Sequence, residues 1–278
     1  MFFRYFAPSL RLQPIIKQYL LFHWEFDRTQ SALVKPFPVR PQQSMAFYLK
    51  GGCKAYEFET GDCKKLPKMN VTGSQTKRYD FHLEASQYML SVEFHPNGLS
   101  KFLQMPISEE FLDGWIDAEA ILSSEIGRVY EQMGNAPTYQ HVIDTIDDYI
   151  WQRISKKPIL THPFDQAGRL MFQYPHRYSI ETFAKESCLS ISQFQRRFKQ
   201  QMGISPKYFV RVNRFYKAYV LRTQNPSLDW LSIALQTGYN DYQHLVKDFK
   251  QFAGTTPNTL LQACEQSPER LLGFRDFT

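Results

Sequence analysis

Two nine-residue segments near the C-terminus are alike, and this repeat constrains the fold more than any other feature of the chain. Residues 198–206 read FKQQMGISP and residues 249–257 read FKQFAGTTP, so they share the pattern F-K-Q-x-x-G-x-[S/T]-P at a displacement of 51 positions. Upstream, residues 183–190 (FAKESCLS) match residues 233–240 (IALQTGYN) at a displacement of 50. Self-similarity at a fixed spacing indicates two copies of one structural unit. Two similar modules therefore stand in tandem.

The first module has the pattern of two helices joined by a short turn. Ser179 is a good N-cap for the first helix and Ser190 for the second, and Gly203 closes the second helix. Cys188 lies at the corner between the two helices. The apolar stripes consist of Ile180, Phe183 and Ala184 on the first helix and of Phe194 and Phe198 on the second.

The second module repeats this pattern. Ser227 precedes its first helix, Gly238 supplies the permissive backbone for the turn, and Asn240 caps its second helix. The apolar stripes consist of Leu228, Leu231, Ala234 and Leu235 on the first helix and of Leu245 and Phe249 on the second. Two helices that meet at a tight corner form the helix-turn-helix arrangement, so we predict two such motifs.

A linker helix is predicted between the modules. Pro206 suits a first helical turn and opens a helix over residues 207–222, which would be roughly 25 Å long at 1.5 Å per residue. Its apolar face contains Phe209, Val212, Tyr216, Tyr219 and Val220. A helix of this length can hold two modules at a fixed separation.

The positive charge of the chain lies in the same block. The whole chain has a formal net charge of +6, whereas residues 176–264 carry twelve basic and five acidic residues, a net of +7. The other 189 residues carry 21 basic and 22 acidic residues, a net of −1. This asymmetry favours an anionic partner, such as double-stranded DNA, for the C-terminal block.

The exposed face of each second helix carries residue types that read bases. Gln suits adenine and Arg suits guanine in the major groove. The candidate base-reading residues are Ser192, Gln193, Gln195, Arg196, Gln243, His244 and Lys247. The candidate phosphate contacts are Lys199, Arg211, Arg214 and Lys250. Any one of them alone could be an ordinary solvated residue, but their joint position on two repeated helices favours a DNA interface.

These motifs resemble the DNA-binding domain of the AraC/XylS family of transcription regulators. Residues 233–257 carry the pattern I-A-x-x-x-G-Y-x-D-x-x-x-L-x-K-x-F-K-x-x-x-G-x-T-P. The resemblance implies seven helices at about 162–264, followed by a tail at 265–278, and recognition helices that enter successive major grooves. It further implies promoter binding and, most often, activation through contact with RNA polymerase. Lys247 stands where the family usually has Arg, so we expect most base specificity in the first module.

The N-terminal part, residues 1–157, has a different texture. Turn formers separate short runs typical of strands at 44–50, 54–59 and 87–94, which predicts a β-rich unit over about 1–105. Helical patterns follow over about 107–155, with helices at 120–133 and 137–154, so the fold class is α+β. This part resembles an uncharacterised sensor-type domain found in some AraC-type regulators. Related regulators carry a cupin-like barrel that binds a small effector, followed by helices that dimerise. The hairpin at 120–154 could form a homodimer interface or simply pack on the β unit.

The chain lacks the residue clusters that catalysis or metal binding would need. Its four cysteines form no C-x-x-C pair, and its seven histidines are scattered without an H-x-H pair. We therefore expect no catalytic residue, metal or cofactor, and the effector-binding residues stay unknown. A DNA-repair alkyl acceptor is disfavoured because no cysteine has a P-C-H-R context. No apolar run approaches the roughly 18 residues of a membrane span, and the start of the chain lacks a secretory pattern, so a cytoplasmic protein without a membrane partner is expected.

Two functional hypotheses remain open at this point. The first is a dimeric transcription regulator, an activator, that responds to a small effector bound by the N-terminal part. The second is a DNA-binding regulator without an effector, in which the N-terminal part serves dimerisation only.

Overall fold

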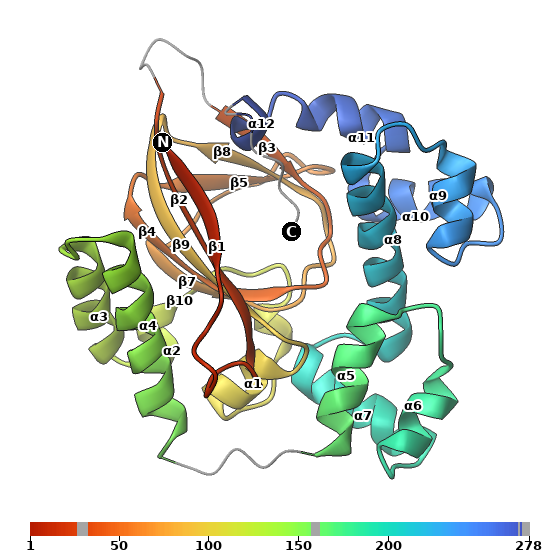
Figure 1. The fold of residues 1–278 in the computed structure, drawn as a ribbon, viewed down its shortest axis with the longest axis horizontal. Helices are drawn as coiled ribbons and strands as arrows, with labels where there is room; N and C mark the ends of the chain where they lie inside the picture. Colours follow the sequence, from red (N-terminus) through yellow and green to blue (C-terminus); the bar gives the residue numbers. More distant parts are fainter. Residues whose placement is uncertain (27–32, 157–161, 272, 274–278) are drawn as a thin grey trace.

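The computed structural model describes residues 1–26, 33–156, 162–271 and 273. In this part of the chain, strands β1–β10 and helices α1–α4 come first, and helices α5–α12 follow (Figure 1). The prediction of a β-rich N-terminal part with a helical extension and an all-helical C-terminal part is confirmed. The sequence Lys156-Lys157-Pro158 predicts a linker between the two parts, and residues 157–161 lie outside the described ranges.

The strands form two antiparallel sheets, which we call the β unit. Its strands are β1 (Phe2–Phe6), β2 (Ile16–Glu25), β3 (Leu33–Phe37), β4 (Gln43–Lys50), β5 (Cys53–Glu57), β6 (Cys63–Lys65), β7 (Met69–Thr72), β8 (Tyr79–Leu83), β9 (Ser86–Phe94) and β10 (Ile116–Asp117). One sheet has the order β1-β2-β9-β4-β7-β10 and the other the order β3-β8-β5-β6. At the centre of the larger sheet, Val92 pairs with both Tyr19 and Met45. The strands predicted at 44–50, 54–59 and 87–94 coincide with β4, β5 and β9.

The larger sheet is buried on both faces. Successive side chains of a strand point to opposite sides, so a strand such as β2 contributes to two different cores. Along β2, Tyr19 and Leu21 belong to the core that packs on helices α1–α4. Phe22 and Trp24 belong instead to a second core between the two sheets, against which Leu20 packs. This double burial explains why β2 reads as a nearly continuous apolar run.

Helices α1–α4 cover the larger sheet. They are α1 (Gly98–Leu103), α2 (Ala118–Leu122), α3 (Glu125–Gly134) and α4 (Tyr139–Ile154), with a short 3-10 turn at Glu109–Phe111. The single helix predicted at 120–133 is wrong: the backbone leaves the helical conformation at Ser123, with φ 68°, which separates α2 from α3. Ser favours caps and turns over helix interiors, which explains the break. Strand β10, which pairs with β7, also lies within the segment predicted as helical.

The apolar faces of α3 and α4 are used inside the chain. Ile126 and Val129 of α3 and Val142 and Ile146 of α4 share one core with the larger sheet. The buried Asp147 of α4 accepts hydrogen bonds from the Tyr19 hydroxyl at 2.9 Å and from the Ser9 amide at 3.0 Å. Of the two roles open for the hairpin at 120–154, its apolar stripes therefore serve packing on the β unit.

The remaining helices form the helical unit. They are α5 (Pro163–Gln173), α6 (Ile180–Glu186), α7 (Ile191–Met202), α8 (Pro206–Gln224), α9 (Trp230–Gln236), α10 (Tyr242–Ala253), α11 (Pro257–Cys264) and α12 (Pro268–Leu271). Helices α5–α11 are the seven helices that the family resemblance implies. The linker helix α8 extends two residues beyond its predicted C-terminal end at 222.

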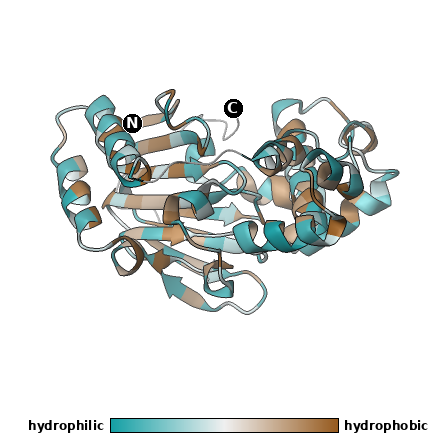
Figure 2. Ribbon diagram, turned by 90° about the horizontal axis from the view of Figure 1, so that it is seen from below, coloured by the Kyte–Doolittle hydropathy of each residue, from teal (hydrophilic) through white to brown (hydrophobic). Residues whose placement is uncertain are grey.

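Figure 2 shows apolar segments along the strands of the β unit and many hydrophilic stretches on the helices. No described helix combines the length and hydropathy needed to cross a membrane.

The β unit holds the C-terminal ends of α7 and α10. The last carbonyl groups of a helix have no partner within the helix, so donors from elsewhere must satisfy them. At the end of α7, the Ser74 hydroxyl donates to Met202 O at 2.6 Å and the Ile107 amide donates to Gln200 O at 2.8 Å. These contacts join the first module to the β unit.

At the end of α10, the Arg78 guanidinium donates to Ala253 O at 2.8 Å and the Val39 amide donates to Phe252 O at 2.9 Å. Gly254, the C-cap of α10, has φ 61° and lies so close to the Phe58 ring that a Cβ atom would come within 2.6 Å of it. The glycine therefore serves both the left-handed backbone and the close approach of the β unit. We call these contacts at the ends of α7 and α10 the clamp.

The clamp should contribute measurably to stability. Arg78→Met removes the donor for Ala253 O and the ion pair with Asp80, while it keeps a long apolar side chain against Phe58. We expect the free energy of unfolding to fall by roughly 1–3 kcal/mol, the cost of leaving a buried polar group without a partner. Urea denaturation of the full chain measures this change. Lys64→Met, an exposed position on β6, is the control, and equal midpoints for the two variants would contradict the role of Arg78.

Candidate functional site

The first helix-turn-helix motif consists of α6, α7 and the turn between them. The Ser179 hydroxyl caps α6 by accepting from the Thr182 amide at 3.2 Å. Ser190 and Gln193 form a capping box at the start of α7, with bonds of 3.2 Å and 3.0 Å. Cys188 in the turn has φ 55°, the left-handed conformation that Gly238 adopts at the equivalent corner of the second motif with φ 84°. The predicted caps of this module are confirmed.

Helix α7 presents a polar face to solvent. Phe194 and Phe198 are buried in the core of the module. The predicted base-reading residues Ser192, Gln193, Gln195 and Arg196 are exposed, as is Lys199. Gln193 also has a structural role, because its side-chain oxygen completes the capping box. The other three are placed together on the outward face of α7, near its N-terminal half.

The second motif consists of α9, α10 and the turn between them, and it corrects two predicted caps. Asp229, not Ser227, caps α9, and Asp241, not Asn240, caps α10. A carboxylate can cap a helix in the same way as a hydroxyl or amide side chain: Asp229 accepts from the Leu231 and Ser232 amides, and Asp241 accepts from the His244 amide. The pKa of the Asp241 carboxyl lies below its usual value, mainly because this carboxylate accepts a hydrogen bond from the backbone amide of His244.

The apolar stripe predicted for α9 is also wrong in part. Ile233 and Ala234 are buried, whereas Leu231 and Leu235 are 52% and 57% exposed. In the run Trp230–Leu235 almost every residue is apolar, so two stripes fit a helical period equally well. Packing against the linker helix α8 selects the stripe that contains Ile233 and Ala234.

Helix α10 presents a face that matches the face of α7. The predicted residues Gln243, His244 and Lys247 are exposed, as is Lys250. The 51-residue displacement pairs Ser192 with Gln243, Arg196 with Lys247 and Lys199 with Lys250. The His244 ring nitrogen Nδ1 lies 2.9 Å from the Asp241 carboxylate, which orients this side chain. The structure thus places two equivalent polar faces on two equivalent helices.

The predicted phosphate contacts Arg211 and Arg214 have partners within the chain. Both arginines lie on α8 and reach the buried Asp248 of α10, at 2.5 Å and 3.3 Å. The Tyr239 hydroxyl donates to the same carboxylate at 3.0 Å, and burial raises the pKa of Tyr239 above its ordinary value. Asp248 is therefore a structural residue that fastens the second recognition helix to the linker helix.

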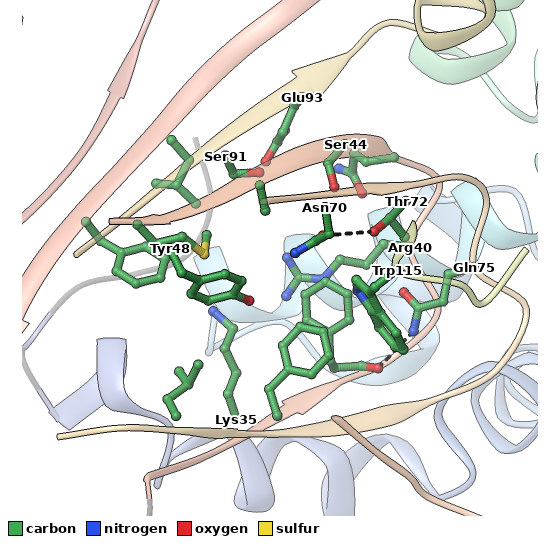
Figure 3. A pocket seen from close by; sticks show the side chains of 18 of the residues that line it. Lys35, Arg40, Ser44, Tyr48, Asn70, Thr72, Gln75, Ser91, Glu93 and Trp115 are labelled. Carbon is green, nitrogen blue, oxygen red and sulfur yellow. Dashed lines mark hydrogen bonds between the residues drawn. The ribbon is translucent and has the colours of Figure 1, made fainter. Parts of the chain in front are cut away.

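A second candidate site is a cavity of about 130 Å³ between the two sheets of the β unit. Its walls include two stacked aromatic pairs: Phe22 with Trp24 from the larger sheet, and Phe37 with Phe81 from the smaller one, each with ring centroids 4.4 Å apart. Lys35 and Arg40 reach into the cavity (Figure 3). An apolar cavity with a few polar groups is typical of a small-molecule site.

The polar groups of the cavity connect it with the helical unit. Lys35 Nζ lies 2.8 Å from a carboxylate oxygen of Glu269, which belongs to α12. The Arg40 guanidinium packs on the Phe37 ring at 4.3 Å and on the Tyr216 ring of α8 at 5.7 Å. The indole nitrogen of Trp24 is buried without a hydrogen-bond partner. Sequence reasoning missed this site because its residues lie on separate strands and on a helix more than 200 positions away.

The described residues include candidate metal ligands and thiols. Among them, no three His, Cys, Asp or Glu side chains lie close enough together to hold a metal ion. All four cysteines are unpaired thiols, and burial raises the pKa of Cys53 to about 12.

Comparisons with known proteins separate the two parts of the chain. The family profile of a helix-turn-helix domain matches residues 183–263, and a domain of unknown function, DUF6597, matches residues 4–113. The chain is 32% identical over 80 residues to the HTH-type transcriptional regulator MtrA of Neisseria gonorrhoeae and 30% identical over 90 residues to an uncharacterized HTH-type transcriptional regulator of Haemophilus influenzae. These matches span 29% and 32% of the chain but only 26% and 30% of the relatives' lengths.

Solved structures are similar at lower identity. ToxT of Vibrio cholerae is 12% identical, with 88% of this chain and 96% of that chain covered and a TM-score of 0.45. The DNA-binding domain of AdpA, in complex with a target DNA, is 19% identical, with 38% and 95% covered and a TM-score of 0.35.

The tandem motifs, the matching profile and the two curated relatives agree on the nature of the C-terminal part, and both relatives are regulators rather than enzymes. The predicted resemblance is confirmed for the C-terminal part: residues 183–263 match a helix-turn-helix domain that this chain shares with HTH-type transcriptional regulators.

Proposed function

We propose that the chain is a sequence-specific transcription regulator that binds promoter DNA through α7 and α10. In this proposal, a small effector binds the β unit and thereby modulates DNA binding. The observation that carries this proposal is the pair of equivalent exposed faces on α7 and α10. These faces lie in the block that holds the whole positive excess of the chain, as a DNA-binding surface requires.

The proposed contacts divide into two kinds. Gln195 and Arg196 of α7, with Gln243 and Lys247 of α10, read base edges, supported by Ser192, Gln193 and His244. Lys199 and Lys250, one helical turn further along, contact phosphates. Arg211 and Arg214, which Asp248 already engages, add positive potential near the backbone of the DNA.

The clamp supports a modulating role of the β unit. Both recognition helices end on donors from this one unit, so a shift of Ser74, Arg78 or Val39 changes the position of α7 relative to α10. Recognition helices must match successive major grooves about 34 Å apart, and DNA binding is therefore sensitive to their relative position. An effector in the cavity between the sheets has a physical route to the DNA-binding face.

The remaining parts of the proposal concern the cellular role. We propose a cytoplasmic activator that contacts RNA polymerase and acts as a homodimer, since two-domain regulators of this kind bind repeated sites. The apolar faces of α3 and α4 pack on the larger sheet, so a dimer interface would consist of residues other than these. Sedimentation of the full chain measures the oligomeric state.

Two substitutions separate base reading from phosphate contact. Arg196→Ala should weaken binding to a selected site by roughly 1–3 kcal/mol and relax preference at one base position, because a bidentate contact is lost. Lys250→Ala should weaken binding evenly across sequences and reduce the salt slope by about one counterion. Selection from random DNA, followed by titrations at several salt concentrations, measures both effects.

Lys64→Ala, which removes an exposed positive charge from β6 of the β unit, is the matched control for net charge. If this control weakens binding as much as Arg196→Ala does, or if both recognition-helix variants bind as the wild type does, the proposed interface is wrong.

A ligand screen distinguishes regulation by an effector from a role of the N-terminal part in dimerisation only. An effector at about 100 times its Kd stabilises the folded chain by about 2.7 kcal/mol, which corresponds to a rise in Tm on the order of 5 °C. We expect such a rise for a compound among sugars, aromatic acids and lipids, and we expect Ala46→Leu, which fills the cavity, to abolish it. A rise that survives Ala46→Leu would place the ligand elsewhere.

A further inference from the structure

Helix α12 returns from the helical unit to the β unit and closes onto the cavity. Only residues 265–267 separate it from α11, and the Ser267 hydroxyl donates to Cys264 O at 2.7 Å across this turn. Both α11 and α12 pack against β3, and Figure 1 shows α12 beside that strand. Pro268 and Glu269 are buried although they lie close to the C-terminus. The last described helix is therefore part of the wall of the cavity.

Glu269 places a carboxylate at the cationic side of the cavity. Its side chain is 5% exposed and pairs with Lys35, whose side chain is 15% exposed. Removing two charges from water is costly, so a buried pair of this kind persists only while both partners stay in place. The pair is thus a polar link between α12 and the interior of the β unit.

The other acidic side chains of the cavity face different partners. Asp113 accepts from the backbone amides of Thr76 and Lys77 at 2.7 Å and 3.0 Å. Glu93 lies 3.4 Å from Lys17 and accepts from Gln18 at 2.9 Å. Glu269 differs from these two carboxylates in its contact with Lys35, one of the two described cations of the cavity.

The volume and the aromatic lining of the cavity suit an aromatic ring. Both stacked aromatic pairs line a volume of about 130 Å³, close to the roughly 150 Å³ of an engineered cavity that binds benzene. The buried indole N–H of Trp24 adds a hydrogen-bond donor without a partner. The site therefore combines a place for one ring with a donor and a cation.

We propose that Glu269 is an internal competitor of the effector, and that a small aromatic carboxylate takes its place at Lys35 and releases α12. This inference rests on the proposed effector role of the β unit. The ring lies between the aromatic pairs, and the carboxylate replaces that of Glu269 with no change in the charge of the cavity. Glu269 then becomes solvated, so binding of the anion and docking of α12 exclude each other.

Release of α12 has a defined route to the DNA-binding face. Cys264 ends α11, and its sulfur accepts a hydrogen bond from the Tyr219 hydroxyl of the linker helix α8 at 3.1 Å. Helix α8 also carries Arg211 and Arg214, which fasten α10 through Asp248. Undocking of α12 thus loosens the end of the second module at the point where it meets the linker helix.

The competition can be tested with benzoate and its uncharged isostere benzamide, titrated calorimetrically against the full chain. Glu269→Gln keeps the size of the side chain but removes its charge, so it should bind benzoate at least about tenfold more tightly than the wild type does. Benzamide should bind both proteins with affinities within about twofold of each other. Lys35→Met, combined with Glu269→Gln, should remove the preference for benzoate. Glu265→Gln, an exposed position one turn away, is the matched control.

Amide hydrogen exchange supplies a readout that does not depend on affinity. Saturating benzoate should speed exchange of residues 267–271 in the wild type, and Glu269→Gln should do so without ligand, whereas Glu265→Gln should not. If benzoate binds the wild type and Glu269→Gln equally, the competition is wrong although an effector site remains. If neither probe binds any variant, the aromatic carboxylate is wrong, and the screen with the Ala46→Leu control then decides separately whether the β unit binds an effector.

Discussion

The architecture depends on the hydrogen bonds that carry the C-terminal carbonyls of both recognition helices onto one β unit. A helix end left without donors is costly when it is buried, so α7 and α10 are stable in this arrangement because Ser74, Ile107, Val39 and Arg78 supply those donors. The linker helix α8 connects the two motifs. In addition, hydrogen bonds from the β unit hold the end of α7 and the end of α10. The mutual position of the exposed polar faces of α7 and α10 is therefore a property of the whole chain.

The cavity between the two sheets also contacts the helical unit. Arg40 touches both the cavity and Tyr216 of the linker helix, and Glu269 joins the cavity to the end of the helical unit. The chain therefore has two connections between the cavity and the helical unit, apart from the clamp itself. Under the proposed function, these connections carry the occupancy of the cavity to α10 without unfolding of either unit.

Much of the helical unit could be predicted because its signals are local. Ser179, Ser190 and Gly203 define helix ends through bonds to residues three or four positions away, and the 51-residue repeat identifies equivalent positions. Prediction failed where local signals were degenerate. In the apolar run of α9 two stripes fitted the helical period, and the contact with α8 selected the one that leaves Leu231 and Leu235 exposed.

The sequence by itself determined the two motifs, the charge of their block and the residue types on their outer faces, since all of these follow from spacing along the chain. Only the tertiary structure decided that Arg211 and Arg214 engage Asp248, that the apolar faces of α3 and α4 pack on the larger sheet, and that Lys35 meets Glu269. These are contacts between residues far apart in sequence. Periodicity describes which face of an element is apolar, but it carries no information on which other element that face will meet.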